Sequence, residues 1–330
     1  MEKKTAIILV TYNGWALTEA CLKDLSGLTD GPFVVAVADN GSSDGTVEKI
    51  RQQFPWVHVY PQAGNLGFGA ANNGAIRGLI ADGIEFDAVC LLNNDTRFDA
   101  CAIVKLREDL DKAGGVVAPT TLNADGSRQN NFFAGLGPDG IGSLQFFLNA
   151  FRGEGGAARV LEGTPQPVTI EAIEQASSEN CAEDASENSA TLLETRWTSA
   201  VCWILSRKLW EAAGGFDEKI FMYYEDGDLA LRLRALGARF FISQESVITH
   251  LGGGSASNSL SRALQHDRSQ QYVFRKHFGI RGLLLSKAFR ITRSLVRMGS
   301  VLPRCFVGAN AKQKREYFRH HFALLKEALS

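Results

Sequence analysis

The run Asn93-Asn94-Asp95-Thr96 follows an apolar stretch and has the residue types of a divalent cation site. Residues two apart in an extended chain point to the same face, so the Asn93 amide and the Asp95 carboxylate would lie together. Oxygen ligands suit a hard cation, which can in turn hold a diphosphate. The same four residues would equally suit a simple turn, so other motifs must decide between these interpretations.

A second acidic cluster, Glu225-Asp226-Gly227-Asp228, stands at the start of a predicted helix. The helix dipole favours acids in a first turn even where they have no other role. That explanation suits Asp228 better than Glu225 and Asp226, which follow an aromatic pair, Tyr223-Tyr224, suited to the face of a sugar. We therefore expect Tyr223, Tyr224 and Glu225 to contact a sugar acceptor.

Two further polar loops follow apolar stretches, Thr11-Tyr12-Asn13-Gly14 and the loop that begins at Asp39. A carboxylate at a strand end can accept a hydrogen bond from the imide N–H of uracil or thymine, and small loop residues let a ligand approach the backbone. Asp39 lies too far before the helix expected at 46–54 to cap it, so we expect it to bind a nucleotide. Asp44 is better explained as a helix cap.

Residues 64–74 form a loop rich in glycine and asparagine before another predicted helix. This signal is weak by itself, because glycines serve tight turns as often as phosphates. The loop lacks the GxGxxG spacing of a dinucleotide site, and no GxxxxGK[ST] motif occurs in the chain. Hydride transfer and P-loop NTP hydrolysis therefore lose their main support.

The elements that must position these loops alternate between strand and helix. Short apolar runs typical of strands buried on both faces lie at 5–10, 33–38, 56–60 and 87–92, with helix-like stretches at 15–26, 46–54 and 69–82. This order predicts an α/β domain with a parallel sheet. Ligands bind outside the carboxyl ends of such strands, where the polar loops stand.

The second half of the chain is less regular. From Glu162 to Glu194 there are eight acids and no Lys or Arg, which indicates a flexible acidic insertion. Beyond it the sequence predicts a strand at 198–205, a helix at 229–236, two short strands at 239–243 and 246–250, and a helical tail from about 262.

Composition narrows the functional classes. The 330 residues are 45% hydrophobic and 22% charged, as in soluble globular proteins, which excludes global disorder. The six cysteines show no CxxC spacing, so we expect mostly buried, reduced thiols rather than a disulfide or zinc framework. No apolar run approaches the roughly 18–20 residues of a transmembrane helix, and we expect a cytoplasmic protein.

The charge is divided unevenly along the chain. Residues 281–330 hold eleven Lys or Arg and two acids, a net charge of +9, whereas the first 280 residues carry −10. This split excludes a uniformly basic nucleic-acid binder. In the tail, apolar residues recur from Leu284 at spacings of four and three, and Arg290, Arg293, Arg297 and Arg304 project from the other side. Two interpretations stay open, a helix packed on its own protein with a solvated basic face and peripheral docking of residues 281–330 on an anionic, cytosolic membrane surface.

Taken together, the motifs resemble the inverting family 2 glycosyltransferases, most closely their rhamnosyltransferase-like branch. The resemblance covers about residues 5–120 and 196–278 and rests on seven motifs in the family's order. They are Val10-Thr11-Tyr12-Asn13, the run from Asp39 to Thr46, Asn65-Leu66-Gly67-Phe68-Gly69, Leu92-Asn93-Asn94-Asp95-Thr96, Gly215-Phe216-Asp217-Glu218, Tyr224-Glu225-Asp226-Gly227-Asp228-Leu229 and His250-Leu251-Gly252-Gly253.

This resemblance implies an α/β fold of GT-A type, in which a Rossmann-like, mostly parallel nucleotide-binding sheet joins an acceptor-binding half, with a helical C-terminal tail. We expect a nucleotide-sugar-binding half at 1–120, a variable region with the acidic insertion at 121–195, an acceptor-binding and catalytic half at 196–278, and the basic tail at 279–330.

The resemblance also implies roles for single residues. Asp226 matches the family's catalytic base, and Asp95 matches the second acid of its DxD metal motif, whose first acid is replaced by Asn93. His250 matches a further ligand of Mn²⁺ or Mg²⁺ found in some members. The implied donor-binding residues are Thr11, Tyr12, Asn13, Asp39, Asn65, Gly67, Asn72, Asn93 and Asn94.

The expected function is therefore metal-dependent transfer of a sugar, with rhamnose as a candidate, from a dTDP- or UDP-activated donor to a cell-surface or lipid-linked glycan. The alternatives are a catalytically silent nucleotide-sugar-binding or scaffold protein and a sugar-phosphate nucleotidyltransferase. The second would normally have a glycine-rich N-terminal loop with Arg or Lys, which Thr11-Tyr12-Asn13-Gly14 lacks.

Overall fold

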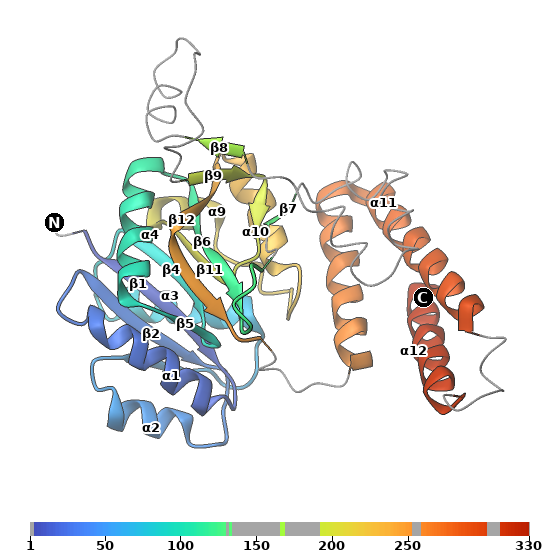
Figure 1. The fold of residues 1–330 in the computed structure, drawn as a ribbon, viewed down its shortest axis with the longest axis horizontal. Coiled ribbons are helices and arrows are strands. Elements are labelled where there is room, and N and C mark those ends of the chain that lie inside the picture. The colour runs from blue at the N-terminus through green and yellow to red at the C-terminus, as the bar shows by residue number, and fades with distance from the viewer. Residues whose placement is uncertain are drawn as a thin grey trace, which may run out of the picture. The chain divides into compact units, whose positions relative to one another are not determined.

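A computed structural model describes residues 3–129, 132–133, 166–168, 192–252, 259–301 and 311–329 (Figure 1). These residues divide into two compact units. Unit 1 holds the described residues up to 133, those from 166 to 221, and 225–252. Unit 2 holds 222–224 and the described residues from 259 onward.

Unit 1 is built on a sheet whose described strands run in the order β3-β2-β1-β4-β11-β6-β12-β9-β8, with β5 pairing β12. Its first four strands are parallel, as the sequence predicts. They are β1 (Thr5–Thr11), β2 (Phe33–Asp39), β3 (His58–Pro61) and β4 (Ala88–Asn93). The predicted helices between them are also confirmed, as α1 (Trp15–Leu25), α2 (Thr46–Gln53) and α3 (Phe68–Ala81), with a short 3₁₀ turn η1 (Ser26–Leu28) after α1.

The rest of the sheet mixes both strand directions. β11 (Cys202–Ser206) runs antiparallel to β4 and to β6 (Val116–Asn123), and β12 (Phe240–His250) runs parallel to β6. The remaining elements of unit 1 are β5 (Thr96–Phe98), α4 (Ala100–Ala113), β8 (Gln166–Val168), β9 (Leu192–Thr195), α9 (Arg207–Ala213) and α10 (Glu225–Ala235), with the small ladder of β7 (Phe132–Phe133) and β10 (Trp197–Thr198).

Three boundaries differ from the sequence prediction. The strand expected at 198–205 is two strands, β10 and β11, and the two strands expected at 239–243 and 246–250 are the single strand β12 with an irregularity between Ser243 and Val247. The helix α10 begins at Glu225, four residues earlier than expected, because the acidic cluster forms its first turn. Of the acidic stretch from Glu162 to Glu194, only the parts in β8 and β9 lie within the described residues, and these pair with each other.

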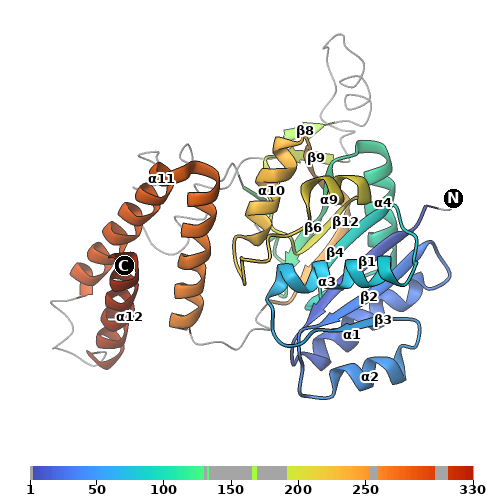
Figure 2. The same ribbon diagram turned by 180° about the vertical axis from the view of Figure 1, so that it is seen from behind.

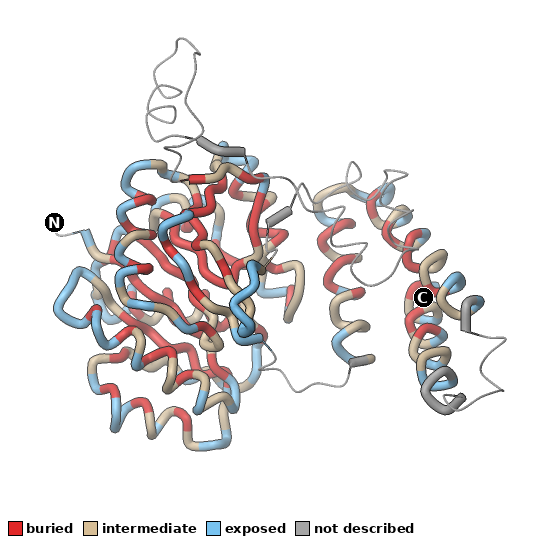
Figure 3. Tube along the Cα trace, in the orientation of Figure 1, coloured by how far each residue is buried: buried red, intermediate tan, exposed pale blue. Residues whose placement is uncertain are grey.

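Helices cover both faces of the sheet. α1 and α4 lie over the face seen in Figure 1, and α3 and α9 lie over the face seen in Figure 2. The burial colouring of Figure 3 places the core along the central strands. One side of it is formed by Leu22, Leu106 and their neighbours on the helices, packed on strand residues such as Leu9 and Leu92.

The cysteines follow the expectation with one exception. Cys21, Cys90 and Cys202 are buried free thiols, whereas Cys101 is exposed at the start of α4, and the other two lie outside the described residues. Burial raises the pKa of the Cys21 thiol to about 12, so it stays protonated at neutral pH.

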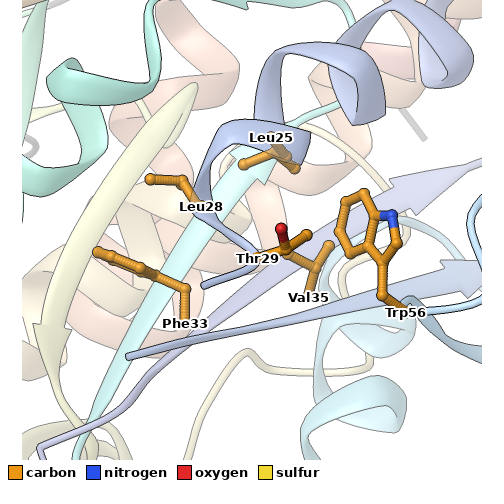
Figure 4. Close-up of a pocket in the computed structure, with 6 residues that line it drawn as sticks. All are labelled: Leu25, Leu28, Thr29, Phe33, Val35 and Trp56. Carbon is orange, nitrogen blue, oxygen red and sulfur yellow. The ribbon is translucent and has the colours of Figure 1, made fainter. Parts of the chain in front are cut away.

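A small cavity of about 50 Å³ opens beside the start of β2 (Figure 4). Its lining is mostly apolar and consists of Leu25, Leu28, Thr29, Phe33, Val35 and Trp56. Because Phe33 and Val35 stand at the amino end of β2, the cavity is remote from the carboxyl end, where the sequence predicts the ligand.

Unit 2 is helical, with α11 (Ser259–Val301) broken at Gly279, which has a φ of 62°, and α12 (Ala311–Leu329) packed against α11. The interpretation of Arg290 as part of a solvated or membrane-facing basic face is wrong. Arg290 is 1% exposed and binds the buried Asp267, while Leu284 on the predicted apolar face is 58% exposed. Arg304 lies outside the described residues. No described helix is both long and apolar enough to cross a membrane.

Candidate functional site

The parallel register brings the predicted donor loops to one edge of unit 1. Thr11 at the end of β1 pairs with Asp39 at the end of β2, and Val10 pairs with Asn93 at the end of β4. All three polar loops therefore leave the sheet side by side, where ligands bind in α/β sheets.

A hydrogen-bond network joins the β1 and β4 loops. The buried Thr18 hydroxyl of α1 lies 2.8 Å from that of Thr11, and the Asn94 amide donates to Thr18 at 2.9 Å. Asn94 thus positions the loop and has little freedom to bind a donor. Tyr12 is half exposed and Asn93 is partly buried, so both remain available to a ligand.

The β1 and β2 loops are also joined directly. The Asn13 side-chain oxygen accepts from the Ser43 N–H at 2.7 Å, and the Asn13 N–H donates to the Ser42 hydroxyl at 2.8 Å. Asn13 adopts the left-handed conformation, with a φ of 49°, which this bonding stabilises. Asp44 accepts from the Thr46 N–H at 3.1 Å and stabilises the start of α2, as expected.

Asp39 has the environment of a ligand-binding carboxylate. Its Oδ2 accepts from the N–H groups of Gly41 and Ser42 at 3.2 and 2.9 Å. Its Oδ1 is buried and has no hydrogen-bond partner among the described residues. A buried acceptor costs free energy until it is paired, so Asp39 presents a vacant acceptor to a donor N–H.

Asn40, which the sequence analysis left out of the site, shapes the glycine-rich loop. Its amide donates to the Gly67 carbonyl at 3.2 Å, and its oxygen accepts from the Leu66 N–H at 3.0 Å. The Asn65 oxygen in turn accepts from Asn40 and from the Gly67 N–H. Asn72 lies in α3, where its buried amide donates to the Phe68 carbonyl at 2.9 Å and its oxygen has no hydrogen-bond partner among the described residues.

Glu225, which is buried, and Asp226, which is half-buried, form a carboxyl pair at the start of α10. Asp226 accepts from the N–H groups of Ala200 and Gly227 at 3.2 and 2.7 Å, whereas Glu225 Oε2 is buried without a hydrogen-bond partner among the described residues. Burial raises the pKa of both groups, and that of Glu225 reaches about 8. Because hydrogen bonds from N–H groups stabilise a carboxylate, the negative charge belongs on Asp226 and the proton on Glu225.

Asp95 and His250 meet where the chain leaves β4 and β12. The Leu251 N–H donates to the Asp95 carbonyl at 2.9 Å, and His250 Nε2 lies 3.2 Å from Asp95 Oδ1. A third residue, Gln129, holds the other side of the ring, with its Oε1 3.1 Å from His250 Nδ1. Nothing in the sequence singles out Gln129, which stands in a hairpin after β6.

The hydrogen bonds of the hairpin determine that Nδ1 of the His250 ring carries a hydrogen. Asp125 can only accept, so the Ser127 hydroxyl donates to it at 2.6 Å and accepts from the Asn123 amide at 2.9 Å. The Asn123 oxygen then accepts from the Gln129 amide at 3.1 Å, which turns the Gln129 oxygen toward His250. His250 Nδ1 therefore carries the hydrogen and donates it.

This arrangement fits a cation. With a hydrogen on Nδ1 alone, the Nε2 lone pair of His250 faces the Asp95 carboxylate, and a cation between the two acceptors would hold them together. With a second hydrogen on Nε2, the ring would instead donate to Asp95 as an ion pair. Neither here nor at any other place in the described part of the chain does a group of three or more His, Cys, Asp and Glu gather that could hold a metal ion. The protein would thus supply two ligands and leave positions for phosphate and water.

The predicted acceptor residues divide between the units. Tyr223 and Tyr224 belong to unit 2, and Glu225 belongs to unit 1. Both tyrosines are left-handed, with φ values of 67° and 66°, and the Tyr224 hydroxyl accepts from the Gln270 amide at 2.7 Å. Backbone strain in two successive aromatic residues is held in place by such contacts and often marks a functional segment.

Comparisons with known proteins agree with the family resemblance. Residues 6–153 match the family model described as glycosyl transferase family 2. N-acetylglucosaminyl-diphospho-decaprenol L-rhamnosyltransferases from two Mycobacterium tuberculosis strains are 27% identical over 322 residues, with 88% of this chain and 94% of each relative covered.

The fold is also similar to a solved structure, the mannosyltransferase PcManGT from Pyrobaculum calidifontis in complex with GDP-Man and Mn²⁺. The TM-score is 0.53 at 15% identity, with 100% of this chain and 86% of that chain covered. This likeness concerns the fold alone, and the fold is the predicted GT-A type. By its motifs, and by the family model and the relatives that it matches, the chain resembles the family 2 glycosyltransferases.

Proposed function

We propose that this glycosyltransferase works with inversion and moves a sugar from a dTDP- or UDP-activated donor to a hydroxyl of a lipid-linked glycan. The observation that carries the proposal is the pair Glu225 and Asp226, in which two N–H groups donate to the half-buried Asp226 carboxylate, while the buried Glu225 has its pKa raised to about 8. Rhamnose is the candidate sugar, and a polyprenyl-diphosphate glycan the candidate acceptor, because the relative's name specifies both.

Asp226 would act as the general base. It would take the proton of the acceptor hydroxyl as the acceptor oxygen attacks the anomeric carbon from the side opposite the leaving nucleoside diphosphate. Its raised pKa makes it a stronger base than an exposed aspartate, while the two N–H groups keep it ionised. Glu225 would remain neutral and limit repulsion within the pair.

The donor would bind along the carboxyl ends of β1, β2 and β4. Asp39 Oδ1, with no partner among the described residues, would accept the imide N–H of the base. The loop of Asn65 and Gly67, fixed by Asn40, would lie along the sugar diphosphate.

Asp95 and His250 would hold a divalent cation, Mn²⁺ or Mg²⁺, with Gln129 as a positioning residue for the ring. When bound, the cation would neutralise charge on the departing diphosphate. Gln129→Ala should then weaken Mn²⁺-dependent binding of the nucleoside diphosphate by about tenfold, the usual effect of removing an outer-shell partner. Nitrogen NMR of the metal-free protein separates the effect on the His250 ring from the effect on metal binding. In Gln129→Ala, loss of the Nδ1–H form of His250 should appear before any metal is added.

The deciding experiment is a panel of nucleotide sugars measured by thermal stabilisation, with and without Mn²⁺, followed by product analysis for those that bind. A ligand specific for the native state raises stability in proportion to the logarithm of its excess over Kd. Stabilisation together with a new glycosidic product supports the proposal. Stabilisation without product with every acceptor offered would instead identify a silent nucleotide-sugar-binding protein.

A further inference from the structure

We propose that unit 2 binds the surface of a bilayer that contains anionic lipids, through an apolar stripe on α11 formed by Ile280, Leu284, Ile291 and Leu295. These positions are separated by four, seven and four residues, so they share one side of the helix. Leu284 and Leu295 are 58% and 52% exposed, and Ile280 is exposed as well.

The side of α11 opposite this stripe is polar and turned inward. Arg290 lies 3.0 Å from the buried Asp267 carboxylate and donates to its carbonyl at 2.8 Å, and Arg293 lies 3.6 Å from the same carboxylate. Ser286 and Ser294 are also fully buried. A water-exposed helix normally has the reverse arrangement. Arg290, Arg293 and Ser286 thus find partners within the protein. The apolar side of α11 suits a hydrocarbon phase.

The charge around the stripe selects the partner. Arg281 and Lys287 stand three residues before and after Leu284, so they flank the stripe on either side, and Arg281 is exposed. On α12, exposed Phe322 stands three residues after Arg319 and four before Lys326, both exposed. Apolar side chains bordered by cations match the boundary between acyl chains and anionic headgroups.

A second copy of the chain fits this surface less well. Arg281 and Lys287 beside the stripe would repel the same residues of a second copy, whereas anionic headgroups would attract them. The inference rests on the proposed function in one respect. A lipid-linked acceptor resides at a membrane, and the stripe would keep the enzyme at that surface.

The test uses the full chain and sedimentation with vesicles of equal parts phosphatidylglycerol and phosphatidylcholine, or of phosphatidylcholine alone. Leu284→Glu with Leu295→Glu should weaken binding to the mixed vesicles at least tenfold, about 1.4 kcal/mol. Leu236→Glu is the matched control, because Leu236 is 51% exposed and lies in unit 1. It should bind as the wild type does. Binding should also weaken from 0.1 to 0.5 M salt and should be poor on neutral vesicles.

Two results would overturn the inference. One is unchanged vesicle binding by the folded double variant. The other is a wild-type dimer in light scattering that the same substitutions convert to monomer, since the stripe would then bind a second copy. If the double variant does not fold, Arg281→Gln with Lys287→Gln provides the test, and it should lose several-fold affinity for mixed vesicles only.

Sugar transfer to a short water-soluble acceptor separates this inference from the proposed function. Variants of the stripe should retain that transfer while they lose vesicle binding. Absence of transfer in every variant would refute the proposed details of glycosyl transfer. If vesicle binding were still sensitive to substitution of Leu284 and Leu295, the inference that this surface binds a membrane would hold.

Discussion

Replacement of Gly67 by alanine tests whether the donor loop depends on close backbone contact. Gly67 has a φ of 89° and a ψ of 169°, a conformation that is essentially restricted to glycine. An added Cβ would lie 2.8 and 2.9 Å from the carbonyl carbon and Cα of Phe221, and would overlap its carbonyl oxygen. All of these atoms belong to the Phe221 backbone and not to a flexible side chain, so the loop itself must move.

The magnitude follows from these contacts. Backbone strain costs about 2 kcal/mol for a residue other than glycine at these φ and ψ values. Loss of the hydrogen bond from the Phe68 N–H to the Phe221 carbonyl, which is 3.2 Å long, would add about 1 kcal/mol. Gly83→Ala is the matched control, with a φ of 71° and no atom within 4 Å of the added Cβ. It should cost about 1 kcal/mol, from the left-handed backbone alone.

Thermal unfolding and nucleotide titration measure the difference. At roughly 2 °C per kcal/mol, Gly67→Ala should lower Tm by about 6 °C and Gly83→Ala by about 2 °C. Gly67→Ala should also weaken binding of the nucleoside diphosphate by at least about tenfold, an estimate based on loss of loop geometry at about 1.4 kcal/mol. Equal Tm values for the two variants, with wild-type nucleotide affinity, would show that the contact with Phe221 does not position the loop.

Three further predictions concern buried charges. Asp226→Asn should abolish transfer and leave donor affinity within a few-fold by calorimetry, because the base acts on the acceptor; turnover near wild type would remove Asp226 from the mechanism. Glu225 has its pKa raised from 4.5 to about 8, so the native state binds a proton that the unfolded state has lost, and unfolding free energy should fall as pH rises from about 4.5 to 8. Glu225→Gln should remove a few kcal/mol of this fall in urea titrations at pH 5 and 8.5 (about 1.4 kcal/mol per pKa unit), and an unchanged slope would contradict the assignment of the proton. Asp267→Asn leaves the buried Arg290 without its counter-charge and should cost about 3 kcal/mol of stability. The control Glu19→Gln, at an exposed ion pair with Lys23, should change stability by less than about 1 kcal/mol. Similar unfolding midpoints for the two variants would contradict a stabilising role of the Asp267–Arg290 pair.

The sequence was sufficient for the parallel half of unit 1 and for the residues gathered at its edge. Buried parallel strands read as unbroken apolar runs, and the residue after each run, such as Thr11 or Asp39, must lie at the carboxyl edge because parallel strands end together. The family resemblance assigned Asp226 its role as the base, which stays a prediction. The antiparallel insertion of β11 between β4 and β6 has no such local signal, because its pairing depends on residues 87 to 118 positions apart.

Tertiary structure alone decided three further points. Gln129 reaches His250 only because β6 and β12 are parallel neighbours with Asn123 opposite His250, a register that no local pattern encodes. The charge state of Glu225 depends on burial and on which carboxyl receives the N–H groups of Gly227 and of Ala200 in a distant loop. Periodicity defines two faces of α11 but not which one turns inward, and the buried Asp267 binds Arg290 and leaves the leucines outside. The sequence periodicity of a helix defines its polar and apolar sides, and the surface on which the helix packs determines which side is buried.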